Sequence, residues 1–306
     1  MDLTTPLGDQ IKKLYQLFKA SHSYFKDESG ANLHIEFIPN GFDVNSDEQA
    51  NYLASICYHI KRGIWKKTVA ALNKLVPGDE LDVDVDKMIS SYFLGSKYSD
   101  AEKRIEHFQK ERNPFILEVL AYTMVYNIEY TPNMNLTLKA MNKVHLSAKI
   151  PGLDVAALAC TPELDYYLII GEAKNRETPS EGTKEAFDAF NRHCKGSTTA
   201  DIRQEMSLLA ESADLLDLNG NELCEKISKE TIWKDRYIYR ITLEHQSVRP
   251  HGGSQFKDYT NYLENVTEAE RKQGEAFGTE RLTKFYNKVS QIILDHIDNK
   301  GVDLSA

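Results

Sequence analysis

The sequence predicts an α/β protein, in which helices cover a sheet and a mostly helical region comes first. Three observations lead to this prediction. Apolar residues recur chiefly at helical spacing through the first third of the 306-residue chain. The second half alternates strand-like runs with helical patterns, an order typical of layered α/β or α+β domains. Hydrophobic residues make up 41% and charged residues 27% of the chain, which excludes fibrous and low-complexity classes.

Residues 1–112 form the mostly helical N-terminal region, which we expect to contact a partner or DNA. Ile11, Leu14 and Phe18 recur at helical spacing, and Pro77–Gly78 ends a longer helical pattern. One alternating, β-rich run interrupts the helices. The expected elements are helices over 10–20, 46–75, 86–93 and 99–110, and a strand over 32–39.

Residues 113–306 form the predicted sheet-containing domain, with a helical C-terminal part. Its strands are short β-prone runs bounded by turn residues, and its helices are amphipathic or apolar patterns. The expected order is a helix over 114–127, strands over 143–150, 153–160 and 166–174, helices over 184–193, 201–215 and 222–228, a strand over 236–243, and a helix over 280–298.

Several features bear on where the protein acts. No run approaches the roughly 20 apolar residues of a membrane-spanning helix, and the first residues lack a basic-then-apolar secretory signal. We therefore expect a cytoplasmic protein that does not span a membrane. The four cysteines (57, 160, 194 and 224) match neither a CxxC zinc site nor a disulfide scaffold, so we expect them to be reduced and buried.

The formal net charge of −9 argues against unaided, non-specific affinity for nucleic acid, because such affinity scales with the number of phosphates that Lys and Arg neutralise. A protein of this charge that acts on DNA or RNA needs a local basic face, a divalent metal or a partner to offset the repulsion.

The stretch 150–176 predicts a β-hairpin, because Pro162 and polar neighbours interrupt two apolar, β-prone runs. A turn centred on Glu163 places Asp154 directly opposite Glu172. Directly opposed residues on one sheet face have Cβ atoms about 4.5–5.5 Å apart, close enough for both carboxylates to hold one hard divalent cation. Lys174 follows Glu172 by two residues and so points to the same face.

These three side chains predict a specific chemistry. Two adjacent carboxylates destabilise a sheet unless a positive charge compensates them, and a bound magnesium ion would do so. The metal would lower the pKa of a bound water, and the lysine could orient or deprotonate that water for attack on a phosphodiester. The alternative is a surface hairpin whose Glu172 and Lys174 are merely solvated.

Pro151-Gly152-Leu153-Asp154, followed after seventeen residues by Glu172-Ala173-Lys174, resembles the signature of the PD-(D/E)xK nuclease superfamily. The resemblance covers roughly residues 114–214. It implies a restriction-endonuclease-like core, with a central mixed sheet flanked by helices. It further implies that Asp154, Glu172 and the carbonyl of Ala173 bind Mg²⁺, for which Mn²⁺ can substitute, and that Lys174 positions or activates water. Glu118, on the helix over 114–127, would be a further acidic catalytic residue and metal ligand.

The layout also resembles the Hachiman HamA and AbpA family of bacterial anti-phage nucleases, which have a GLDV...GEAK core, a helical N-terminal extension and a helix-rich tail. In that family the nuclease subunit pairs with a helicase-like ATPase. The resemblance implies a DNA nuclease that serves as the effector of an anti-phage defence complex. Its helicase-like partner would offset the repulsion between the negatively charged chain and DNA.

Basic side chains near the hairpin are candidate nucleic-acid contacts. They are Lys143, His145 and Lys149 on one face of the strand over 143–150, and Arg192 and Lys195 near the end of the following helix. Such residues would touch the phosphate backbone. The alternatives are an edge strand protected by lysines and a solvated helix face.

Two other functions fit the same residues. The first is a stand-alone type II restriction-like endonuclease, which would bind DNA and give discrete fragments without a partner. The second is a non-catalytic adaptor subunit that keeps the nuclease-like fold and binds its partner through the N-terminal region. The presence of all three motif residues favours the catalytic functions over the adaptor.

Overall fold

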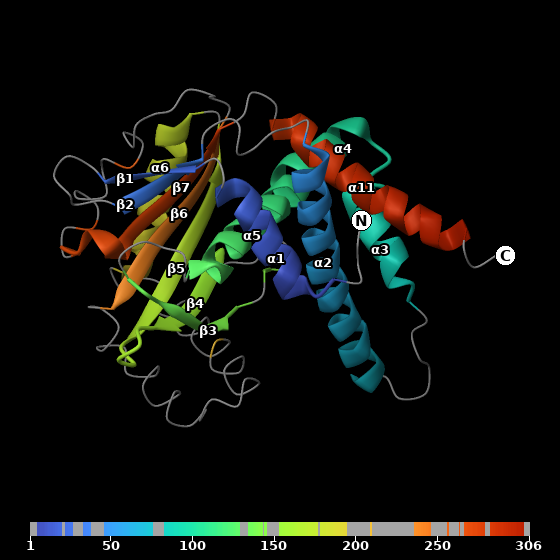
Figure 1. The fold of residues 1–306 in the computed structure, drawn as a ribbon. Helices are drawn as coiled ribbons and strands as arrows, with labels where there is room; N and C mark the ends of the chain where they lie inside the picture. Colours follow the sequence, from blue (N-terminus) through green and yellow to red (C-terminus); the bar gives the residue numbers. More distant parts are fainter. Residues whose placement is uncertain are drawn as a thin grey trace.

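A computed structural model shows an α/β protein with a seven-stranded mixed sheet at its centre (Figure 1). The structure describes residues 5–19, 22–26, 33–37, 46–75, 83–128, 134–142, 144–145, 153–176, 178–194, 209, 236–245, 256, 263, 266–278 and 282–302. The strand order is β1-β2-β7-β6-β5-β4-β3. The fold is thus of the predicted class.

The sheet combines a parallel centre with antiparallel edges. Strands β2 (Leu33–Phe37), β7 (Lys272–Gly278), β6 (Tyr237–His245) and β5 (Tyr166–Asn175) run parallel to one another. At one edge β1 (His22–Lys26) pairs antiparallel with β2. At the other edge β4 (Val155–Cys160) and β3 (Thr137–Met141) continue the sheet antiparallel from β5.

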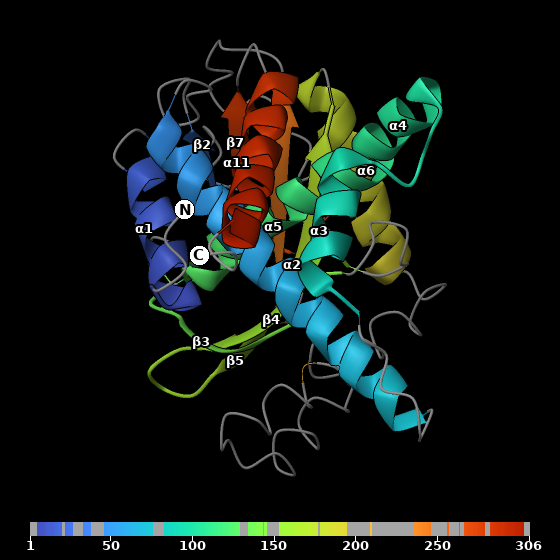
Figure 2. The ribbon, with the colours of Figure 1, turned by 90° about the vertical axis from the view of Figure 1, so that its right-hand side faces the viewer.

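Each face of the sheet is covered by helix. Helix α6 (Pro179–Cys194) packs on β5 and β6 on one face. Helix α5 (Asn113–Tyr126) packs against β4 and β5 on the other face, and it is buried along nearly its whole length. The remaining helices pack outside α5 (Figures 1 and 2): α1 (Leu7–Lys19), α2 (Asp47–Leu75), α3 (Val85–Leu94) and α11 (Leu282–Val302).

Helix α5 belongs to a longer helical run. Helix α4 (Ala101–His107) continues through a short π-helical segment, η2 (Phe108–Arg112), directly into α5. Asp100 caps α4 by accepting a hydrogen bond from the amide of Glu102. The only charged residue of α5 is Glu118, because the rest of its sequence is apolar or neutral. This composition lets α5 lie between the sheet and the outer helices.

Most predicted elements are confirmed, with bounds that shift by a few residues. The prediction of a strand over 143–150 is wrong for Val144 and His145, which lie outside any strand, and the strand preceding the hairpin is β3. Strands β1 and β7 were not predicted. The helices expected over 201–215 and 222–228 lie outside the described residues, except for residue 209.

The N-terminal region shares its sheet and its core with the rest of the chain. Strand β2 pairs with β7, so residues 33–37 and 272–278 are neighbours in the sheet. Helices α1, α2 and α3 contribute to one apolar cluster together with α5 and α11. The boundary after residue 112 falls inside the continuous run from α4 to α5. The expected division at this point therefore does not coincide with a break in the packing.

The helices that the structure describes include none that is both long enough and apolar enough to cross a membrane. Among the predicted free cysteines, Cys57 and Cys160 are unbridged and buried. Cys224 lies outside the described residues, as does the side chain of Cys194.

Candidate functional site

The hairpin of β4 and β5 has the predicted register. Val155 pairs with Gly171 and Cys160 with Tyr166. At the turn, the amide of Thr161 donates to the carbonyl of Asp165 at 3.0 Å, and Leu164 adopts a left-handed φ of 65°. This register places Asp154, one residue before β4, beside the end of β5.

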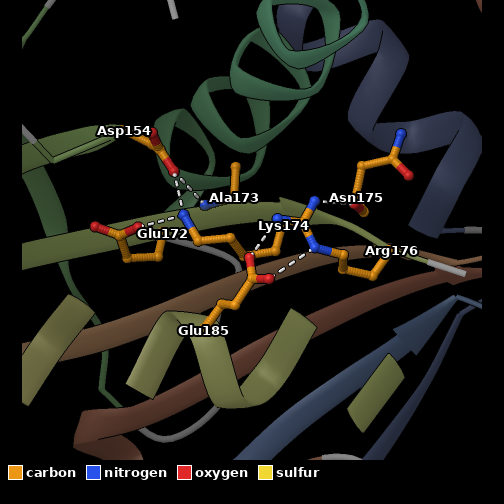
Figure 3. Close-up of polar contacts among 7 residues, drawn as sticks. All are labelled: Asp154, Glu172, Ala173, Lys174, Asn175, Arg176 and Glu185. Atoms are coloured by element: carbon orange, nitrogen blue, oxygen red, sulfur yellow. Dashed lines mark hydrogen bonds and ion pairs between the residues drawn. The ribbon is translucent and has the colours of Figure 1, made fainter. Parts of the chain in front are cut away.

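Asp154, Glu172 and Lys174 converge as the hairpin register predicts (Figure 3). The Nζ of Lys174 donates to Oε2 of Glu172 at 2.5 Å and to Oδ2 of Asp154 at 3.3 Å. The same Asp154 oxygen accepts a hydrogen bond from the amide of Ala173 at 2.7 Å. The ammonium group therefore lies between the two carboxylates and neutralises part of their charge.

Glu118 approaches the same place from α5. Its side chain is buried, and Oε2 has no hydrogen-bond partner among the residues that the structure describes. The pKa of Glu118 is raised to about 8, chiefly by burial and next by the negative charge of Asp154. His145, Lys61 and Lys174 act in the opposite direction. Glu118 therefore lies within electrostatic range of both hairpin residues.

The charges of the three hairpin residues depend on one another. Burial raises the pKa of Asp154, while Lys174 opposes this effect and Glu172 adds to it. Burial disfavours the ammonium form of Lys174, but Asp154 and Glu172 outweigh it and raise the pKa of Lys174. Lys174 is consequently protonated at neutral pH and acts as a hydrogen-bond donor. This charge state fits the positioning of a water or a phosphate oxygen better than proton abstraction.

A cleft of about 480 Å³ opens beside these residues. It lies at the carboxyl end of β5, an edge where open α/β sheets commonly bind ligands. Its walls include Glu118, Asp154 and Lys174. Segment η2 contributes Gln109 and Lys110, and π-helical turns are frequent at functional sites. Two of the predicted carboxylates thus line the cleft, and Glu172 lies behind Lys174.

The candidate nucleic-acid contacts are distributed differently. His145 lies close enough to Glu118 for its charge to lower the pKa of that carboxyl. Arg192 is exposed on α6. Lys143, Lys149 and Lys195 lie outside the described residues. Only His145 among the described members of this set is therefore brought near the predicted catalytic residues.

The cleft contains an ion pair that sequence reasoning missed. Arg176 and Glu185 line the same cleft, and they form an ion pair in which Nη2 of Arg176 lies 2.5 Å from Oε2 of Glu185. Arg176 continues the alternation of Glu172 and Lys174, and this pattern could have indicated it. Glu185 comes from the following helix, so no local pattern links it to the hairpin.

The donor set fits a hard divalent cation in its chemistry. Glu118, Asp154 and Glu172 offer carboxylate oxygens, the ligands that Mg²⁺ prefers. The unpartnered Oε2 of Glu118 leaves a buried acceptor available. In this structure the ammonium group of Lys174 balances the charges of Asp154 and Glu172. Among the described residues, no group of three or more His, Cys, Asp and Glu side chains is spaced to hold a metal. Binding a cation between the carboxylates would require Nζ of Lys174 to shift.

No protein-family model matches this chain, and no curated protein is significantly similar to it.

Proposed function

We propose that this protein is a metal-dependent nuclease with a PD-(D/E)xK core, which hydrolyses phosphodiester bonds of DNA. The observation that carries the proposal is the convergence of Asp154, Glu172 and Lys174 at the end of β5, where Asp154 and Lys174 line a cleft. The buried Glu118 supports it, because a single charged residue in an otherwise apolar helix is costly to fold and is typical of a functional position.

The residues of the chain have distinct roles in this mechanism. Glu118, Asp154 and Glu172 would hold Mg²⁺, and the bound ion would supply an activated water and neutralise charge on the phosphate. The protonated Lys174 would donate to the attacking water or to a phosphate oxygen. The amide of Ala173 fixes Oδ2 of Asp154 and so orients this carboxylate toward the cleft.

The proposal extends to a biological role. We propose that the protein is the effector subunit of a bacterial anti-phage complex and that a helicase-like ATPase is its partner. The net charge of −9 supports this extension, because a partner that holds DNA would offset the repulsion between the chain and its substrate.

The test is degradation of linear, nicked and supercoiled plasmid by the purified full chain with Mg²⁺, beside Glu172→Ala and Lys174→Ala. We expect each substitution to lower the rate by more than about 100-fold, because each removes a group that acts on the reacting phosphate. Chelator should abolish cleavage. The matched control is Glu163→Ala in the exposed hairpin turn, which should cleave like the wild type.

Thermal melting of every variant establishes that the fold is retained. Wild-type cleavage by Glu172→Ala would contradict the proposal. If the wild-type chain alone is inactive, the assay is repeated with the product of the neighbouring gene, which the proposal expects to be the ATPase partner. Absence of cleavage in both assays would also contradict the proposal.

One observation favours a second function. Lys174 pairs with both Asp154 and Glu172, so these three side chains balance much of their own charge, and such a site also suits an adaptor subunit that retains the fold without activity. This function predicts that the chain binds its partner, that Glu172→Ala binds it equally well, and that neither cleaves DNA.

A further inference from the structure

Arg176 lies next to the proposed catalytic residues on the wall of the cleft. It follows the end of β5, two residues after Lys174, and both residues line the cleft with Asp154. Because side chains alternate along a strand, Glu172, Lys174 and Arg176 point to the same side. Two residues of β-structure advance about 6.6 Å, which is the scale on which successive phosphates of a nucleic acid strand are spaced.

The carboxylate of Glu185 on α6 pairs with the guanidinium of Arg176 (Figure 3). Nε of Arg176 donates to Oε1 at 2.8 Å and Nη2 donates to Oε2 at 2.5 Å, so the two groups meet at two points. Nη1 donates to the carbonyl of Asn175 at 2.7 Å. Within the part of the chain that the structure describes, Arg176 is the only polar partner of Glu185.

The ion pair is open to solvent. The side chains of Arg176 and Glu185 are 45% and 43% exposed. Exposed ion pairs contribute little to stability, so the fold does not depend on this contact. An anion that binds the guanidinium more strongly can therefore displace Glu185 without disturbing the packing.

Helix α6 lies close enough to β5 to hold Glu185 at this place. A Cβ atom at Gly182 would lie 3.4 Å from Cβ of Lys174 and 3.7 Å from Cγ of Arg176. Glu185 follows Gly182 by three residues, close to one helical turn. The amide of Arg176 donates to the carbonyl of Glu244 at 3.1 Å, which fixes the arginine backbone. The backbone position of Arg176 is thus set by the sheet.

We propose that Arg176 is a phosphate-binding subsite of the cleft and that Glu185 occupies it when nucleic acid is absent. The inference rests on the proposed function and deepens it. A carboxylate and a phosphate each present two oxygens to the planar fork of arginine, so Glu185 stands in for a phosphate. The phosphate next to the reacting one displaces Glu185 and pairs with Arg176.

The test is the affinity of the full chain for a labelled DNA duplex, measured by fluorescence anisotropy at several salt concentrations. Chelator is present, so no metal-dependent cleavage interferes. We expect Arg176→Ala to weaken binding about 10-fold and to reduce the slope of log affinity against log salt by about 1, as loss of one phosphate contact should. Arg176→Lys keeps the charge but lacks the fork, and it should restore the slope but only part of the affinity.

Glu185→Gln should tighten binding about 3- to 10-fold, because the competing carboxylate is removed. Asp188→Asn on the exposed part of α6 is the matched control, because it removes the same charge from the same helix at a residue that does not pair with Arg176. In the Arg176→Ala background, Glu185→Gln should act no more strongly than Asp188→Asn.

Unchanged affinity and slope in Arg176→Ala would overturn the subsite, as would equal effects of Glu185→Gln and Asp188→Asn. Failure of Glu185→Gln to bind DNA measurably would overturn it as well. The two proposals fail separately. Cleavage that depends on Glu172 but not on Arg176 would contradict only the proposed phosphate-binding subsite. Binding that depends on Arg176, without cleavage under any condition, would contradict only the proposed nuclease activity.

Discussion

Burial of the ionisable side chains of Lys61 and Glu118 costs folding free energy, so stability does not explain their presence in the core. The ammonium group of Lys61 lies 3.6 Å from the ring centre of Tyr92 and 4.0 Å from that of Phe115, and burial lowers the pKa of Lys61 to about 7. Both aromatic rings favour the charged form. Glu118 opposes the lowering of that pKa, so the two groups interact electrostatically through the apolar layer.

Replacement of Glu118 should change stability and activity in opposite directions. We expect Glu118→Gln to raise the free energy of unfolding at pH 7, because a neutral side chain avoids the cost of a buried carboxylate whose pKa is about 8. The same variant should lose Mg²⁺-dependent cleavage. Urea denaturation and the plasmid assay measure the two effects. A variant that is less stable yet fully active would contradict this assignment.

Glu244 gives a pH-dependent prediction at a residue that does not itself line the cleft. Its side chain is 2% exposed, Oε2 has no partner within the described residues, and burial raises its pKa well above 4.5. Such a group is protonated in the fold while the unfolded chain ionises, so stability falls as pH rises above about 4.5. Glu244→Gln should remove this fall and be more stable at pH 7, with the difference vanishing below pH 4.5.

Urea denaturation between pH 4 and 8 measures this effect, with the exposed Glu163→Gln as control. An identical pH dependence in wild type and Glu244→Gln would show that this carboxyl is not the cause.

Part of the candidate site could be predicted because it is local. Asp154, Glu172 and Lys174 belong to one hairpin, and the turn at Pro162 sets their register. Glu118 was indicated only by resemblance, because its distance to Asp154 depends on how α5 packs. Arg176 was missed although it continues the alternation of Glu172 and Lys174, whereas Glu185 lies on the following helix and has no sequence pattern that links it to the hairpin.

At the level of elements, β7 shows how a strand can escape prediction. Its sequence, KQGEAFG, is polar and rich in glycine, yet every residue is buried. Arg240 of β6 compensates the buried charge of Glu275 by forming an ion pair with it, and Thr242 donates to the same carboxylate. A long-range partner thus satisfies charges that would otherwise exclude the segment from a core. Strands β4, β5 and β6 contain more apolar, β-prone residues, and they were predicted.

At two glycines, replacement by alanine should change the stability of the protein in opposite directions. A Cβ at Gly274 in β7 would lie 2.4 Å from the ring of the buried Phe256, whereas a Cβ at Gly63 in α2 would meet nothing within 4 Å. We expect Gly274→Ala to destabilise the protein by about 1–3 kcal/mol through overpacking. Gly63→Ala should stabilise it by about 0.5–1 kcal/mol, because alanine favours helix. The urea midpoints of the two variants should move in opposite directions, and a shared direction would contradict the packing.

For the whole molecule, the shared core makes the two parts of the chain interdependent. Lys288 of α11 pairs with Asp47 of α2 at 2.6 Å, and Nη2 of Arg112 donates to Asn287 at 2.6 Å. Strand β2 covers one edge of β7, and helices α1 and α2 cover α5. Removal of residues 1–112 would expose both an unpaired strand edge and a large apolar surface.

We therefore expect the fragment 113–306 to aggregate or to unfold without a cooperative transition. The same fragment co-expressed with residues 1–112 should recover a cooperative transition if the two associate. Size-exclusion chromatography and thermal unfolding followed by circular dichroism would measure this. Cooperative unfolding of the isolated fragment would show that residues 113–306 are an independent domain.

The place of β7 between β2 and β6 also fixes the order of events during synthesis. Ribosomes add about 5–20 residues per second, and the earliest parts of a chain emerge first. β2 is made early, but its neighbour β7 begins only at Lys272, so this edge of the sheet must wait for nearly the entire chain. The cleft is also lined by Thr283, which is made later still. Under the proposed nuclease function, a nascent chain would carry Asp154, Glu172 and Lys174 well before the cleft is complete, and this delay would protect the cell's own DNA while the protein is being made.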